Sequence, residues 1–270
     1  MAFTRAELLA AVEREPAAAA VHDREAWVGL FTANGRVDDP VGSRPHRGRS
    51  QIARFYDTFI GPRDITFHRD VDVVVGVTVI RDLELALTMT AGLTMRIPAY
   101  LRYDLQPVGD ALKIARLQAF WELPMMVGQF LRNGARAVPA GTQLTLSLVR
   151  NQGLAGAAGF LGGLRGVGSA GKRQFERFLD DARAGDEVAV RRRLAKGAAV
   201  TTGDDGALST STLLNRLAAA HWRKPIAAGR SLVVGVEREG RRDVLIADVN
   251  PKPFTVNRIR YFTEAGFRGT

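Results

Sequence analysis

The sequence of 270 residues contains no cysteine and only four histidines. The lack of cysteine excludes disulfides, thiolate nucleophiles and cysteine zinc sites, and it fits a reducing compartment. His22, His46, His68 and His221 show no metal-ligand spacing. We therefore expect neither a metal site nor another cofactor.

The amino terminus lacks the charged start and apolar core of a signal peptide. Thr4 and Glu7 instead have the spacing of a capping box, which begins an amphipathic helix carrying Leu8, Leu9 and Val12. These features predict a cytoplasmic protein.

Acidic residues are missing from one long segment, residues 123–175, which holds six Lys or Arg and no Asp or Glu. Residues 1–122 are nearly neutral, with 15 basic and 16 acidic residues, and residues 176–270 carry 17 basic against 12 acidic. We expect any anionic surface to be met through the middle and C-terminal parts of the chain, and a membrane through residues 123–175. No basic aromatic platform or phosphate-binding glycine loop is visible, so nucleic acid is not an expected partner.

Two segment pairs match in the same order along the chain, which indicates an internal repeat. Residues 22–37 resemble residues 185–200, with an aspartate and a valine 14 positions apart in both. Residues 114–122 resemble residues 256–264, and both have the pattern of a late strand. The sequence thus predicts a first domain over 1–124, a connector over 125–171 and a shorter second domain over 172–270.

The periodicity of both halves predicts helices followed by long strands. In the first half, residues 51–59 have helical spacing, whereas residues 71–80, 83–94, 97–105 and 112–122 are rich in β-branched and aromatic residues. In the second half, helices are expected at 172–184 and 211–221, with strands at 231–237, 243–249 and 254–262. This order is typical of an α+β fold with helices laid on one antiparallel sheet.

The most informative motif for chemistry is Asp39-Pro40-Val41-Gly42. Asp39 is expected to end a short strand, and the proline and glycine after it favour a turn, so its carboxylate is positioned to point into a cavity. A carboxylate in an apolar pocket is a candidate general base. An aspartate before proline also commonly starts a turn, so a purely structural role for Asp39 stays open.

Together with Pro45, His46, Gly48, Ile52, Phe55-Tyr56 and the strand 117–121, this motif resembles the ketosteroid isomerase and SnoaL-like branch of the nuclear transport factor 2-like superfamily. The resemblance covers about residues 20–122, and residues 178–186 with the strand after them resemble the shorter SnoaL-like modules. It implies a curved antiparallel sheet with helices forming a cone, a cystatin-like α+β barrel, in two tandem units. The residues expected to line its apolar pocket are Phe31, Phe55, Tyr56, Ile97, Ala99, Leu117 and Trp121.

The resemblance implies that Asp39 removes a proton next to a ketone while two hydrogen-bond donors stabilise the developing enolate oxygen. In this chain the expected donor positions fall on Glu15, next to the helix-breaking Pro16, and on Ala99. An ionised glutamate cannot donate a hydrogen bond, and alanine has no side-chain donor. The chain therefore lacks the oxyanion donors expected for efficient ketosteroid isomerisation.

The connector is unusual because residues 153–171 contain eight glycines interleaved with large apolar residues. A flexible linker is normally polar, so these apolar residues need a partner. They are expected either to pack across the two domains or to lie in a membrane interface. The stretch between Arg150 and Arg165 is too short for a membrane span.

Three function classes remain open from the sequence. The first is an isomerase, lyase or hydratase that uses Asp39 as base on a steroid-like or polyketide-like ketone. The second is a non-catalytic binder of a sterol, fatty acid or polyketide, associated with membranes through residues 123–175. The third is an interaction scaffold with an idle cavity, or an RNA-associated protein as the high pI suggests, with RNA binding ranked last. Separately, the second domain is expected to cover the open sheet face and make an internal pseudo-dimer, or the chain to form homo-oligomers.

Overall fold

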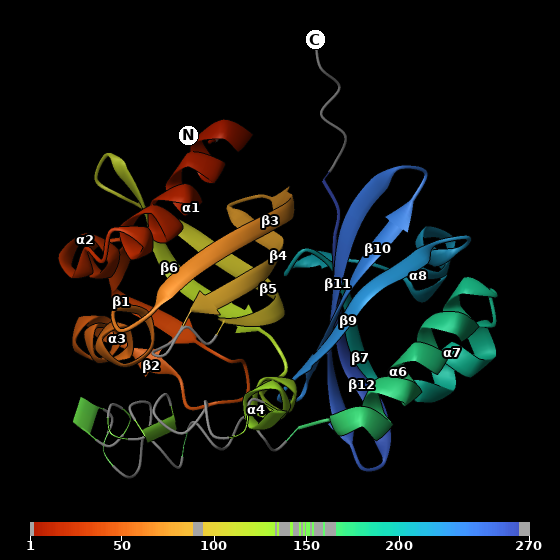
Figure 1. Cartoon of the computed structure of the whole chain (residues 1–270). Coiled ribbons are helices and arrows are strands. Elements are labelled where there is room, and N and C mark those ends of the chain that lie inside the picture. The colour runs from red at the N-terminus through yellow and green to blue at the C-terminus, as the bar shows by residue number, and fades with distance from the viewer. Residues whose placement is uncertain are drawn as a thin grey trace. The chain divides into compact units, whose positions relative to one another are not determined.

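A computed structural model describes residues 3–88, 94–132 and 166–264, with single positions between them at 134, 141, 142, 146, 148, 150, 151, 153 and 159. The chain divides into two compact units (Figure 1). Unit 1 comprises residues 1–72 and 76–164, and unit 2 comprises residues 73–75 and 165–270. Most of the Gly-rich connector lies outside the described residues, so its expected packing stays a prediction, as do the domain limits at 124 and 172.

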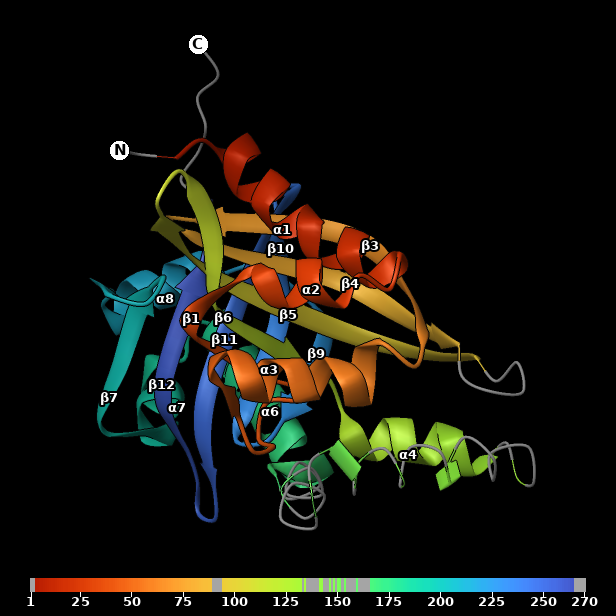
Figure 2. The same cartoon turned by 90° about the vertical axis from the view of Figure 1, so that its left-hand side faces the viewer.

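In unit 1, helices at the start of the chain lie against one face of a six-stranded sheet (Figure 2). The helices are α1 (Arg5–Ala20), α2 (Arg24–Gly29), α3 (Gly48–Phe55), the π-helix η1 (Tyr56–Ile60) and α4 (Leu123–Arg132). The strands are β1 (Phe31–Asp38), β2 (His46–Arg47), β3 (Asp64–Val75), β4 (Thr78–Thr88), β5 (Thr94–Val108) and β6 (Ala111–Phe120).

Unit 2 is also built from helices and a six-stranded sheet. Its helices are α6 (Gly168–Arg183), α7 (Glu187–Arg193) and α8 (Thr210–Leu217). Its strands are β7 (Leu194–Thr202), β8 (Gly206–Ala207), β9 (His221–Ala228), β10 (Ser231–Arg238), β11 (Arg241–Pro251) and β12 (Phe254–Phe262).

The two sheets have the same strand order, which confirms the predicted repeat. The orders are β2-β1-β6-β5-β4-β3 and β8-β7-β12-β11-β10-β9. The register agrees as well, because Val37 pairs with Leu117 in the first sheet and Val200 pairs with Ile259 in the second. The matched aspartates have one local role: Asp23 accepts a hydrogen bond from the Ala26 amide and begins α2, while Asp186 does the same for α7.

Each sheet is mixed, and this corrects the expectation of an antiparallel sheet. β1 runs parallel to β6, and β7 runs parallel to β12, whereas the other pairs are antiparallel. A parallel pair is possible here because the intervening chain supplies a long crossover. Within the described residues no pairing joins β2 to β3, so the predicted barrel is an open sheet.

Several predicted element limits differ from the observed ones. β4 is continuous through residues 81 and 82, where a break was expected, because the turn lies earlier, at Gly76, which has φ +58°. The capping box of Thr4 and Glu7 is confirmed. α1 does not end at Pro16 but continues to Ala20, which keeps Glu15 on a helical turn.

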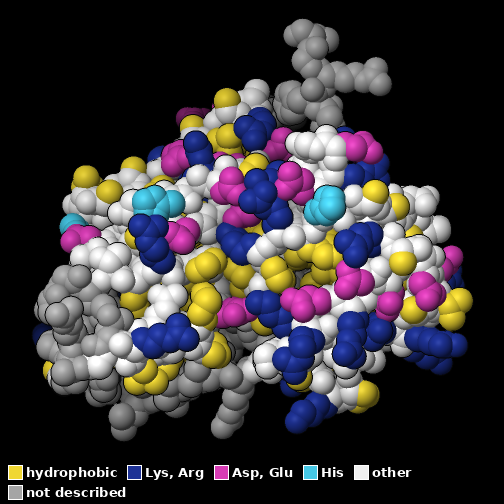
Figure 3. Space-filling model, turned by 45° about the vertical axis from the view of Figure 1, so that its right-hand side comes forward, with side chains coloured by type: hydrophobic (Ala, Val, Ile, Leu, Met, Phe, Trp, Pro, Cys, Tyr) yellow, Lys and Arg dark blue, Asp and Glu magenta, His cyan; other side chains and the backbone are white. Residues whose placement is uncertain are grey.

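Charges are mixed rather than concentrated over the face in Figure 3, where Lys and Arg side chains lie among Asp and Glu side chains. In unit 2, Arg191 pairs with Glu187 at 2.7 Å and Arg223 pairs with Glu237 at 3.1 Å. Part of the positive charge of this chain is thus compensated locally. Exposed ion pairs of this kind contribute little to stability.

Candidate functional site

Unit 1 contains an apolar cavity of about 320 Å³ between its helices and its sheet. This volume lies at the lower end of the range of about 300–1,000 Å³ found for small-molecule sites. Five side chains with polar atoms reach a lining that is otherwise almost entirely hydrophobic, namely Glu15, Asp39, Arg63 and the indoles of Trp27 and Trp121. The apolar lining comes from the helices and from several strands, and includes Phe55, Phe59, Ile60, Ile65, Phe67, Leu85, Leu87, Met95, Ile97, Leu101 and Leu117.

Helix α4 contributes Met126, Val127 and Phe130 to the same lining. Its Gln129 side chain donates to the Arg96 carbonyl of β5 at 2.9 Å, which ties the helix to the sheet. The apolar side of this amphipathic helix therefore covers part of the cavity.

Asp39 lies at the end of β1, where the sequence predicts it. The Val41 amide donates to the Ala119 carbonyl at 2.8 Å, so the turn after Asp39 is fixed to β6. The Trp121 indole nitrogen donates to Asp39 Oδ1 at 2.7 Å. Asp39 is partly exposed, and it lines the cavity. A carboxylate in an apolar cavity is thus held in a defined orientation.

Burial raises the pKa of Asp39 from 3.8 to about 6. The hydrogen bond from Trp121 opposes this rise because it stabilises the anion, and the neighbouring Asp38 charge reinforces it. At neutral pH most of the Asp39 population is ionised, yet its basicity is far above that of an exposed aspartate. These are the properties of a general base.

Glu15 is the second carboxylate of the cavity, and its side chain is only 3% exposed. Trp27 donates its indole N–H to Glu15 Oε1 at 2.8 Å, and the Tyr103 hydroxyl donates to Oε2 at 3.2 Å. Trp27 and Tyr103 are fully buried. Glu15 is therefore held from α2 on one side and from β5 on the other.

Burial raises the pKa of Glu15 from 4.5 to about 7. The hydrogen bonds from Trp27 and Tyr103 and the charge of Arg81 oppose the rise, whereas the charge of Asp39 adds to it. About half of the Glu15 population is thus neutral near pH 7. This corrects the treatment of Glu15 as an ionised group, because a protonated carboxyl can donate a hydrogen bond.

The predicted pocket residues fall into two groups. Asp39, Phe55, Ile97, Leu117 and Trp121 line the cavity. Phe31, Tyr56 and Ala99 are buried but do not belong to its lining.

The three residues outside the lining have identifiable positions. The rings of Phe31 and Tyr56 lie 4.9 and 5.4 Å from Trp27, so both pack around the indole that orients Glu15. Ala99 lies on β5 between Ile97 and Leu101, and the alternation of the strand places it on their face. Its methyl group brings no donor to that face.

Sequence reasoning missed three polar residues: Trp27, Tyr103 and Arg63. Tyr103 lies four positions after Ala99 and so shares its face of β5, which is a signal that strand alternation offers. Trp27 is one of only three tryptophans in the chain, but its contact with Glu15 depends on how α1 and α2 meet. Arg63 has no sequence signal that separates it from surface arginines.

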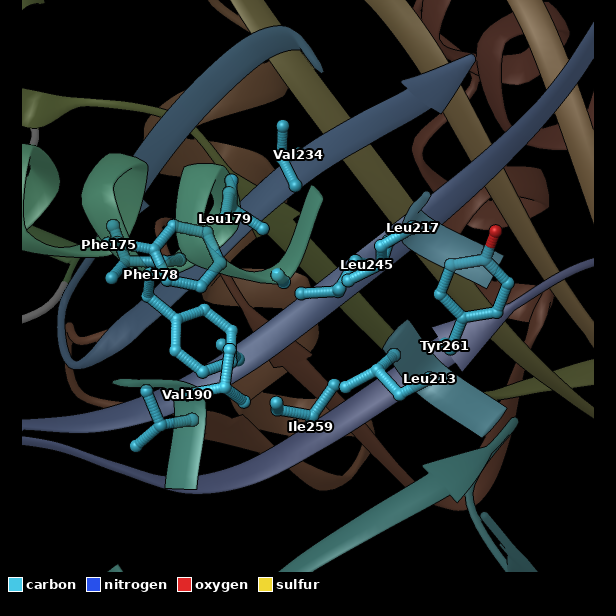
Figure 4. Close-up of a cluster of buried hydrophobic side chains, with 14 of the residues drawn as sticks. Phe175, Phe178, Leu179, Val190, Leu213, Leu217, Val234, Leu245, Ile259 and Tyr261 are labelled. Atoms are coloured by element: carbon cyan, nitrogen blue, oxygen red, sulfur yellow. The ribbon is translucent and has the colours of Figure 1, made fainter. Parts of the chain in front are cut away.

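Unit 2 differs from unit 1 at the matching positions. The register places Thr202 at the position of Asp39 and Thr263 at that of Trp121. Fully buried side chains, among them Phe175, Phe178 and Leu179, pack from its helices onto its sheet (Figure 4). In unit 2, threonines thus stand at the positions of the Asp39 carboxylate and of its Trp121 donor, and the space between helices and sheet holds a packed core.

Within the described residues, no cluster of three or more His, Asp or Glu side chains has a geometry that could hold a metal ion. In the part of the chain that the structure describes, no helix combines the length and apolar character needed to cross a membrane.

No protein-family model matches the chain, and no curated protein matches it in sequence. Among solved structures, a Mycobacterium tuberculosis protein in complex with estradiol-17beta-hemisuccinate is 21% identical over 44% of this chain and 96% of its own, with a TM-score of 0.41. The Delta 5-3-ketosteroid isomerase from Mycobacterium sp. is 24% identical over 44% of this chain and 95% of its own, with a TM-score of 0.40.

A third similar structure is the epoxide hydrolase/cyclase-like enzyme of pyran ring formation in polyether salinomycin, which is 21% identical over 44% of this chain and 93% of its own, with a TM-score of 0.40. These proteins are what the chain is similar to. At such identities and scores, they assign it no ligand and no reaction.

Proposed function

We propose that unit 1 binds a small apolar molecule in its cavity and moves a proton on it, with Asp39 as general base and Glu15 as general acid. The observation that supports this most is that two carboxyl groups line one apolar cavity and that each is oriented by an indole N–H. Pairs of titratable groups whose environments differ are frequent at sites of acid–base chemistry.

The hydrogen-bond pattern around Glu15 determines where its proton resides. The Trp27 indole can only donate, so Glu15 Oε1 accepts, and the proton of the neutral form is on Oε2. The Tyr103 hydroxyl beside Oε2 can turn and accept that proton, or leave it to a ligand oxygen. Glu15 thus presents one donor toward a bound molecule.

The reaction class that fits is proton abstraction next to a carbonyl group. Asp39 takes the proton from the carbon, the electron pair moves to the carbonyl oxygen, and Glu15 donates a hydrogen bond or its proton to that oxygen. Asp39 then returns its proton at another carbon of the conjugated system, and Glu15 takes back the proton from the oxygen if it had given it, so that both groups regain their starting forms. In its neutral form Glu15 fills one of the two expected donor positions, while the position of Ala99 stays without a side-chain donor.

A direct test uses 5-androstene-3,17-dione, a Δ5-3-ketosteroid, and follows absorbance of the conjugated product. We expect Asp39→Asn to lose turnover by at least about 100-fold, the scale of general base catalysis. Steroid binding, read from quenching of Trp27 and Trp121 fluorescence, is expected to remain. Asp64→Asn is the matched control, because this carboxylate of unit 1 is 77% exposed. Binding without turnover by the intact protein would sink the isomerase form of the proposal.

A second candidate function is binding without catalysis. It is favoured by the Trp121 hydrogen bond, which occupies Asp39 Oδ1 and lowers its basicity, and by the lack of a donor at Ala99. In this case the same titration is expected to give equal steroid affinity for the intact protein and Asp39→Asn, with no product from either.

Membrane delivery of the ligand through residues 123–175 is an extension of this second candidate. Liposome flotation with anionic vesicles, with and without residues 150–171, tests it, and binding that is insensitive to salt and to the deletion would remove it. Cytoplasmic location and an internal pseudo-dimer or homo-oligomer stay predictions.

A further inference from the structure

Arg63 is a buried cation in the wall of the unit 1 cavity. It follows η1 and precedes β3, and it is 8% exposed. The cavity residues around it in sequence, Phe59, Ile60 and Ile65, are apolar. A charged group in such surroundings carries a large desolvation cost unless a partner compensates it.

Among the described residues, hydrogen bonds from the Arg63 guanidinium come from one nitrogen, Nη1. Nη1 donates to the carbonyl of Thr58 at 2.7 Å and to that of Phe59 at 2.8 Å, and the guanidinium carbon lies 6.0 Å from the Phe59 ring centre. Both carbonyls belong to the end of η1, where a cation is favourable. Within the described part of the chain, neither Nε nor Nη2 makes a hydrogen bond.

No carboxylate among the described residues pairs with Arg63. Burial lowers the pKa of Arg63 to about 10. The group therefore stays charged at neutral pH, and no ion pair among the described residues joins it to Glu15 or Asp39. The unused Nε–Nη2 edge has the fork geometry that matches a carboxylate in two parallel hydrogen bonds.

We infer that the ligand of this cavity is an apolar monocarboxylate, whose carboxylate binds the Nε–Nη2 edge of Arg63 while its apolar body fills the cavity. The inference rests on the proposed function and adds the class of ligand. It also fixes the orientation, because Glu15 and Asp39 repel a carboxylate and leave their end of the cavity to an uncharged part of the ligand.

A purely structural role explains less of what is observed. Donation to the Thr58 and Phe59 carbonyls explains the position of Nη1. A neutral side chain with an N–H group could cap these carbonyls without burying a charge. A capping role does not explain why the Nε–Nη2 edge makes no hydrogen bond with the described residues, nor why Arg63 lies on the cavity wall.

The test compares dodecanoate with dodecanol, two probes that share an alkyl chain and differ in charge, at pH 8 in the full-length protein. Tryptophan fluorescence or calorimetry gives the two dissociation constants. We expect dodecanoate to bind about 10-fold or more tightly than dodecanol, as a charge-assisted bidentate pair implies. Equal binding, or tighter binding of dodecanol, would overturn the inference while leaving an apolar ligand site intact.

Variants sharpen the comparison. Arg63→Gln is expected to abolish the preference for dodecanoate with little change for dodecanol, and Arg63→Lys to keep a reduced preference because lysine lacks the fork. Arg49→Gln is the matched control, since this unit 1 arginine is 67% exposed. An unchanged preference in Arg63→Gln would overturn the inference. If Arg63→Gln does not fold, the intact protein and Arg63→Lys decide. Failure of both probes to bind would contradict the proposed cavity function itself.

Discussion

The Trp121 indole N–H donates to Asp39 Oδ1 at 2.7 Å, across the parallel pair formed by β1 and β6. The two residues lie 82 positions apart in the chain, and the register of the two strands brings them together. At the corresponding positions of unit 2 stand Thr202 and Thr263. The repeat therefore conserves the strand arrangement while only one unit has the carboxylate and its donor.

Replacing Trp121 with Phe is expected to raise the pKa of Asp39 above its value of about 6, because the hydrogen bond that stabilises the anion is lost. The expected rise is about one unit, given that one unit corresponds to about 1.4 kcal/mol. Carbon-13 NMR titration of labelled aspartate carboxyl groups measures it, with Asp39→Asn giving the assignment.

The matched control is Trp222→Phe in unit 2, whose indole donates to Asp180 at 3.5 Å. It makes the same change of side chain and is expected to leave the Asp39 titration in place. A Trp121→Phe protein with an unchanged or lower Asp39 pKa would show that this hydrogen bond does not tune the base.

Glu15→Gln is expected to stabilise the protein at pH 8 and not at pH 4. The folded-state pKa of Glu15, about 7, lies above its ordinary value of 4.5, so the folded state binds this proton more tightly than the unfolded state. Its contribution is fully present below pH 4.5 and is lost as the pH rises through 7. The loss amounts to roughly 3 kcal/mol, at about 1.4 kcal/mol per pKa unit.

Glutamine reproduces the neutral form, because its carbonyl can accept from Trp27 and its amide can donate to Tyr103. Urea unfolding of the intact protein and of Glu15→Gln between pH 4 and 8 measures the difference in the free energy of unfolding. Because the Asp39 charge acts on Glu15, the difference reports Glu15 together with this interaction. Parallel stability curves would mean that Glu15 titrates like an exposed glutamate.

Tyr103→Phe is expected to move the pKa of Glu15 upward from about 7, since the Tyr103 hydroxyl stabilises the anion through its bond to Oε2. The size is expected to be about one unit, in line with one hydrogen bond to a charged group. Carbon-13 NMR of labelled glutamate carboxyl groups reports it. A fall in this pKa would show that Tyr103 acts mainly as an acceptor.

Local patterns were sufficient to predict some features from the sequence. Asp39 could be placed at a strand end because Pro40 and Gly42 follow it, and Asp23 and Asp186 could be matched with each other because each precedes a valine by the same interval. The repeat could be predicted for the same reason, since both halves keep one spacing through helix and strand.

The chemistry of the cavity could not be predicted in this way. The pKa of Glu15 depends on burial and on Trp27 and Tyr103, which lie 12 and 88 positions away in the chain. Likewise, Arg63 differs from an exposed arginine only through the apolar walls that the fold places around it. Tertiary contacts of this kind leave no periodic signal in the sequence.

The two units are expected to respond differently to removal of a phenylalanine. Phe178 of unit 2 is fully buried, with its ring 6.0 Å from that of Phe175, so Phe178→Ala leaves a closed void and is expected to cost about 3–5 kcal/mol. Phe130 of α4 is only partly buried and already borders the unit 1 cavity. Phe130→Ala enlarges an existing space and is expected to cost less than about 1.5 kcal/mol. Urea unfolding monitored by circular dichroism compares the two, and equal losses would mean that the cavity of unit 1 is packed as tightly as the core of unit 2.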